Sequence, residues 1–143
     1  MVRFIDLWRG HPINESVTAP CIAPHDLTNM EGQPVAMGFP VFHNQCAIRL
    51  GVALRRAGVT DGQIGGCAAC AVHPRSDMHF INASQLANAL SHANIPGIGM
   101  VEKITGTEAA HYYPKLFGRT GIIYFQDYWK RTSDSGRATG APD

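Results

Sequence analysis

The sequence has no long apolar run and no excess of charge of one sign. No segment approaches the roughly twenty apolar residues of a membrane-spanning helix, and residues 1–6 lack the basic start, apolar middle and small-residue cleavage site of a signal peptide. Twelve Lys and Arg stand against eleven Asp and Glu without forming a basic stripe. We therefore expect a protein made in the cytoplasm, without a membrane span or a nucleic-acid partner.

Length and patterning favour one α+β domain. With 143 residues and 45% hydrophobic content, the chain is long enough for one core, and we expect a single domain over 1–143 with a polar tail at about 132–143. Apolar spacing and capping signals predict helices at 4–10, 45–57 and from 83 to about 93, and a short helix after Thr105. β-branched and aromatic runs predict strands at 78–81, 98–104 and 121–125, the last of them central.

Cys46 stands in the first turn of the helix predicted at 45–57, with Asn44 as its N-cap. Amide hydrogens in the first turn of a helix have no partner within it, so they stabilise a thiolate and later the oxyanion of an attacked carbonyl. Cys46 is therefore a candidate nucleophile, and the alternative is a small apolar residue that packs a core helix. The polar side chains of Asn44 and Gln45 are candidate oxyanion donors, although N-capping explains Asn44 equally well.

The three remaining cysteines leave several interpretations open. Cys67 and Cys70 form a lone C-x-x-C, which is typical of a zinc half-site, a redox pair or a local disulfide. A zinc site from this pair with Cys21 and His73 has irregular spacing, so we predict no metal and no cofactor and keep a small metal-binding module as an alternative. A disulfide among Cys21, Cys67 and Cys70 is favoured in an oxidising compartment, and free thiols in a reducing cytosol.

Four blocks of the sequence, spread in order over nearly the whole chain, resemble the fourth family of type VI secretion amidase effectors. They are 4–12 (FIDLWRGHP), 44–54 (NQCAIRLGVAL), 85–90 (QLANAL) and 121–129 (GIIYFQDYW). The resemblance implies a papain-like fold of the NlpC/P60 kind, in which the cysteine begins a buried helix packed on a small antiparallel sheet. It also implies a cysteine amidase that cuts peptidoglycan stem peptides between D-glutamate and meso-diaminopimelate.

The resemblance implies partners and a place of action as well. Members of this family are injected by the type VI apparatus into the periplasm of a rival bacterium, and a cognate immunity protein neutralises them in the producer. The substrate is then the peptidoglycan stem peptide.

Cys46 matches the family's nucleophile, and its own N–H would contribute to the oxyanion hole. The family's base is a histidine in a C-terminal segment that reads roughly G-D-H-I-D-L-W-N, which this sequence lacks. We therefore expect a truncated member with weak or absent hydrolysis. His79 is the candidate substitute base because it lies on a predicted strand, and Asp127 is better explained by strand capping than by catalysis. The alternative is an inactive effector relic that binds an immunity protein or a cell-wall peptide.

Overall fold

The computed structural model describes residues 1–126, and over this part of the chain the protein is an α+β structure with five α-helices and a small two-stranded sheet. The α+β class predicted from the sequence is therefore confirmed. The helices are α1 (Phe4–Gly10), α2 (Cys46–Arg56), α3 (Ala83–His92), α4 (Gly106–Ala110) and α5 (Tyr113–Leu116), with short 3₁₀ helices η1 (Pro12–Asn14), η2 (Asp61–Gln63) and η3 (Arg75–Asp77).

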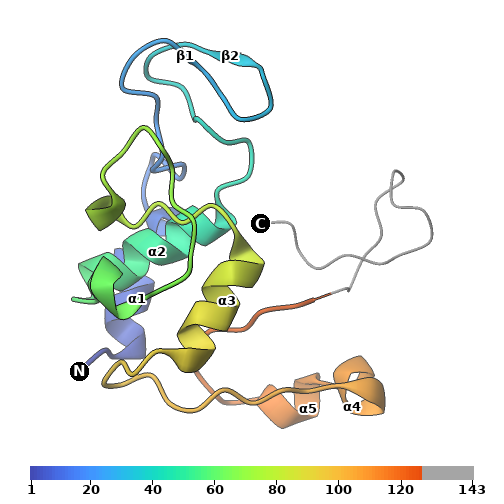
Figure 1. The fold of residues 1–143 in the computed structure, drawn as a ribbon. Helices are drawn as coiled ribbons and strands as arrows, with labels where there is room; N and C mark the ends of the chain where they lie inside the picture. The colour runs from blue at the N-terminus through green and yellow to red at the C-terminus, as the bar shows by residue number, and fades with distance from the viewer. Residues whose placement is uncertain (127–143) are drawn as a thin grey trace.

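The sheet is a hairpin of β1 (Leu27–Thr28) and β2 (Pro34–Val35), which run antiparallel with Leu27 opposite Val35. The Asn29 side chain closes the hairpin, because its Oδ1 accepts the backbone N–H groups of Glu31 and Gln33 at 3.0 and 2.9 Å. Figure 1 shows the hairpin at the end of the molecule away from α3.

Helix α2 lies between two hydrophobic clusters and contributes to both. Its Ala47 and Leu54 belong to a larger cluster with residues of α3 and of the segments 59–67 and 78–80. Its Ile48 and Val52 belong to a second cluster, which we call the Cys21 cluster and which consists of Cys21, Ala23, Val41, Ile48, Val52 and Cys70. A helix that is apolar on two sides is buried rather than amphipathic on one face, so α2 is the central element of the fold (Figure 1).

The helix ends follow the local signals closely. Helix α1 ends at Gly10 and α2 ends before Gly58, whose φ of +98° suits glycine. Asn82 caps α3 as predicted, since its Oδ1 accepts the Gln85 N–H at 2.9 Å. At α4, Thr105 occupies the N-cap position but forms no side-chain capping bond, so the helix is confirmed and the capping box predicted there is not.

Two of the predicted strands are wrong. Residues 98–104 and 121–125 lie outside the helices and strands of the described chain, and Ile122 and Ile123 are 41% and 52% exposed. High β-propensity yields a strand only where a neighbouring segment supplies ladder hydrogen bonds and an apolar face to cover. The third segment, 78–81, pairs with residues 68–70 through a single bridge between Ala69 and Phe80.

Residues 99–126 form an exposed arm that carries α4 and α5 and contains no buried residue. Figure 1 shows the two helices displaced from α1, α2 and α3. Exposed ion pairs occur within the arm, between Lys115 and Glu108 at 3.1 Å and between Arg119 and Glu102 at 3.0 Å. No helix among the described residues has the length and apolar content to cross a membrane. Asp127 and the predicted polar tail at 132–143 lie outside the described residues.

Gly51 sets how closely α2 approaches the segment at 78–80. A Cβ atom at this position would lie 2.0 Å from the backbone oxygen of Met78, a separation that real Cβ atoms do not show. Only glycine therefore allows this segment to cross the helix at the observed distance.

We expect Gly51→Ala to lower the free energy of unfolding by roughly 1–3 kcal/mol, even though alanine in a helix is favoured over glycine by about 1 kcal/mol. The reason is the clash between the new Cβ and the Met78 backbone, which cannot move without displacing the core. Thermal or urea denaturation measures the change. Gly65→Ala is the control, because nothing lies within 4 Å of a Cβ there; equal stability of the two variants would contradict the close crossing.

Candidate active site

Cys46 is the first residue of α2, and its side chain is exposed. The helix ladder begins with the Arg49 N–H, which donates to the Gln45 carbonyl at 2.8 Å. The amides before Arg49 therefore stand at the positive end of the helix, where a negative charge on sulfur is stabilised. The Cys46 N–H itself donates to Asn44 Oδ1 at 3.2 Å. An exposed thiol at a helix N-terminus is the arrangement expected of a nucleophile.

The N-cap of α2 is Gln45, not Asn44 as predicted from the sequence. Gln45 is buried and fixes the start of the helix to the Cys21 cluster. Its Oε1 accepts the Cys21 N–H at 2.9 Å, while its Nε2 donates to the carbonyls of Cys21 at 2.8 Å and Phe42 at 3.2 Å. Both hydrogens of the amide are therefore engaged. The predicted role of Gln45 as an oxyanion donor receives no support from this geometry, which instead gives it a positioning role.

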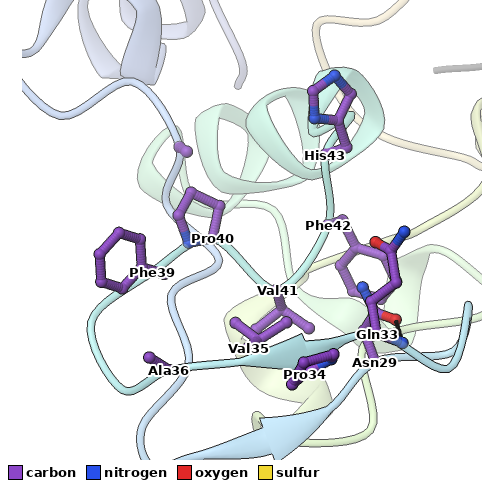
Figure 2. Close-up of a pocket in the computed structure, with 11 residues that line it drawn as sticks. Asn29, Gln33, Pro34, Val35, Ala36, Phe39, Pro40, Val41, Phe42 and His43 are labelled. Atoms are coloured by element: carbon purple, nitrogen blue, oxygen red, sulfur yellow. Dashed lines mark hydrogen bonds between the residues drawn. The ribbon is translucent and has the colours of Figure 1, made fainter.

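A hollow of about 420 Å³ lies beside the entry to α2, between the hairpin and residues 39–43. Figure 2 shows Asn29, Gln33 and Phe42 on one side in this view, and Phe39 on the other. His43 completes the lining three residues before Cys46, which is not itself a lining residue. The hollow is therefore lined by the segment that leads into α2 and not by the thiol itself.

His79, the predicted substitute base, is buried and only 6% exposed. Its ring packs against His73 with centroids 4.6 Å apart, and its Nδ1 has no hydrogen-bond partner among the described residues. Burial, followed by the neighbouring His73, lowers the pKa of His79 to about 4. An imidazole with this pKa accepts a proton poorly near neutral pH, so the prediction of His79 as base gains no support.

The other three cysteines are buried free thiols, so the disulfide weighed from the sequence stays a prediction. Cys67 lies apart, with its Sγ 3.9 Å from the Ala68 carbonyl. Cys21 and Cys70 instead approach one atom, His73 Nδ1, at 3.6 and 3.5 Å. Burial raises the pKa values of the Cys21 and Cys67 thiols. The C-x-x-C spacing does not reveal this grouping, because Cys21 and His73 are 52 positions apart and no local signal links them.

Comparison with known proteins gives the class of protein. A family model described as type VI secretion system amidase effector protein 4 matches residues 42–142, which include Cys46 and most of the chain. No curated protein and no solved structure matches. The chain is thus a type VI secretion amidase effector, a class delivered into target cells in bacterial antagonism to act on peptidoglycan. It belongs to the fourth family of these effectors.

We expect Cys46 to react first when the native protein meets iodoacetamide, because it is exposed while the other three thiols are buried. Peptide mapping by mass spectrometry after a short exposure should find the label mainly on Cys46. Repeating the reaction in denaturant is the control, since unfolding should remove the selectivity. Prior labelling of Cys67 in the native protein would contradict the geometry.

Gln45→Leu should destabilise the protein by roughly 2–4 kcal/mol, because the Cys21 N–H and C=O would remain buried without partners. Asn44→Ala offers a comparison: it removes the exposed hydrogen bond that Asn44 Oδ1 accepts from the Cys46 N–H, and it should lower stability by about 1 kcal/mol or less. Denaturant unfolding measures both. Similar small losses in the two variants would show that the Gln45 bonds do not hold the helix start.

Proposed function

We propose that this effector is a cysteine amidase that hydrolyses the bond between D-glutamate and meso-diaminopimelate in peptidoglycan stem peptides, with Cys46 as nucleophile. The observation that supports it best is the exposed thiol at the start of α2, inside the region matched by the family model. The bond specificity, and an NlpC/P60-like papain fold over one domain at 1–143, follow from the sequence resemblance.

The proposed reaction has two steps. The Cys46 thiolate attacks the D-glutamyl carbonyl carbon, the C–N bond breaks, and the diaminopimelate amine leaves with a proton while a thioester forms on sulfur. Water then hydrolyses the thioester and releases the D-glutamyl carboxylate. The Cys46 N–H is the natural oxyanion donor, and for this it must exchange its bond to Asn44 Oδ1 for one to the substrate oxygen.

The hollow beside α2 supports a peptide substrate. Its lining combines the apolar side chains of Phe39 and Phe42 with the amides of Asn29 and Gln33 and the imidazole of His43. A stem peptide carries both methyl groups and amide or carboxylate groups, so such a mixed lining suits it. We propose that the stem lies in this hollow with its reacting carbonyl reaching toward Cys46.

The proton acceptor is the weakest part of the site. All seven histidines fall among the described residues, and the one predicted as base, His79, is buried with its pKa lowered to about 4. We therefore propose slow hydrolysis, because His79, the predicted base, accepts a proton poorly near neutral pH. This observation also favours a second candidate function, a member that binds a cell-wall peptide or its immunity protein with little turnover in the target periplasm.

The nucleophile is tested by incubating purified peptidoglycan sacculi with the protein and with Cys46→Ala. We expect soluble stem-peptide fragments with a new diaminopimelate amino terminus from the unchanged protein, and none from the variant. Chromatography with mass spectrometry identifies the fragments. Cys67→Ala is the matched control, since it also removes one thiol but not the exposed one. Equal fragment yields from Cys46→Ala would remove Cys46 from the mechanism.

The proton acceptor is tested by adding imidazole to the same assay. Because free imidazole can supplement a poor proton acceptor, we expect the hydrolysis rate to rise with its concentration. The opposite result is a fast rate that imidazole does not change. If His79→Gln abolishes that rate and preserves the Tm, His79 is the base. Binding of sacculi without any fragments under either condition would favour the non-catalytic function.

A further inference from the structure

A second cluster of reactive side chains lies in the Cys21 cluster, away from the exposed thiol. The Sγ atoms of Cys21 and Cys70 lie 3.6 and 3.5 Å from the same atom, His73 Nδ1, and the three potential ligand atoms are all within 4.8 Å of one another. Cys21 and Cys70 are buried, and His73 is partly buried. Three donor atoms from two distant parts of the chain thus converge on one point.

Two full hydrogen bonds to one nitrogen do not account for this convergence. A neutral imidazole has one acceptor nitrogen with a single lone pair, so His73 Nδ1 cannot accept fully from two thiols at once. Ligands of a tetrahedral zinc ion, with Zn–S of about 2.3 Å and Zn–N of about 2.0 Å, lie about 3.5 Å apart from sulfur to nitrogen. The two distances observed, 3.6 and 3.5 Å, agree with this value.

We propose that Cys21, Cys70 and His73 bind one Zn²⁺ ion. Thiolate and imidazole together are the donor set that favours zinc over the hard cations magnesium and calcium. On binding, the two thiols release two protons to solvent, and the resulting pair of thiolates neutralises the ion. A buried site without net charge avoids the desolvation penalty that an isolated buried charge carries.

His79 is a candidate for the fourth ligand. Its ring packs on His73, and its buried Nδ1 has no hydrogen-bond partner among the described residues. A buried polar atom without a partner is rare in native structures and calls for an explanation. Three protein ligands leave one position of a tetrahedral ion to be filled. Cys67 is not part of the proposed site, which otherwise uses three of the four residues considered from the sequence.

The proposed ion would join the N-terminal loop to the loop at 67–73. Cys21 is also the residue whose backbone pairs with the buried Gln45 amide, one position before Cys46. The metal would therefore stabilise the start of α2 without touching substrate. This role is structural and does not depend on the proposed amidase activity.

The experiment is a titration of the reduced full-length chain with Co²⁺, the spectroscopic substitute for zinc, under anaerobic conditions. We expect one equivalent to bind with the visible bands of tetrahedral coordination and the near-ultraviolet bands of thiolate ligation, and Zn²⁺ to displace it. Zn²⁺ should also raise the Tm, because it binds the folded state. Metal affinity and Tm are both independent of hydrolysis, so failure here is distinguishable from failure of the proposed function.

Cys70→Ser and His73→Ala should each weaken Co²⁺ binding by at least about a hundredfold, since even residues that only support ligands change affinity by 10–100-fold. Cys67→Ser is the matched control and should keep both the bands and the affinity. Circular dichroism of the metal-free variants separates lost ligation from lost folding, and His73→Gln serves if His73→Ala does not fold.

Two results would overturn the proposal. One is a reduced, folded protein that gives no tetrahedral Co²⁺ spectrum. This result overturns the proposal whether or not the protein forms a Cys21–Cys70 disulfide in air, which would be seen as a mass loss of two hydrogens. The other is a Co²⁺ spectrum that Cys67→Ser abolishes and Cys70→Ser leaves unchanged, which would assign the metal to different thiols. An unchanged spectrum in His79→Gln would remove His79 alone and leave the three-ligand site in support of the proposal.

Discussion

The pair of hydrogen bonds between the Gln45 amide and the Cys21 backbone is the interaction on which the candidate site depends. It joins two segments that are 24 residues apart, and it does so in the interior, where Gln45 is 1% exposed. The hydrogen bonds of a buried amide are strongly directional, whereas apolar packing tolerates small shifts of the side chains. Cys46 is the next residue along, so this bond pair fixes the backbone directly before it.

The two hydrophobic clusters fix the orientation of α2 about its own axis. Ile48 and Val52 pack into the Cys21 cluster, while Ala47 and Leu54 pack on the other side, so the helix cannot rotate without disturbing both. Gly51 lets the segment at 78–80 cross the helix in contact with its backbone. A nucleophile at the end of such a helix is held in place by the core itself, which is the rigidity that positioning of a reacting atom requires.

The parts of this molecule that the sequence predicts well are those encoded by neighbouring residues. Asn82 with Gln85, and Gly58 after α2, are local signals, and the helices they delimit are present within a residue or two. The run at 121–125 has strong β-propensity but is not a strand in the described chain, because strand formation depends on partners that a local pattern does not specify. The same limit explains the thiols: Cys46 is recognisable from its own helix, whereas Cys21 meets Cys70 and His73 only through tertiary structure.

The separation of the thiols has a chemical consequence for the proposed use of Cys46 as a nucleophile. Thiol–disulfide exchange needs a thiolate that can reach its target, and the burial that raises the pKa of Cys21 and Cys67 keeps those thiols protonated and enclosed. Cys46 is the exposed thiol, at the positive end of a helix. Coordination of Cys21 and Cys70 by zinc would occupy the remaining reactive sulfur atoms. The proposed ion would thereby keep Cys21 and Cys70 from forming a disulfide with Cys46.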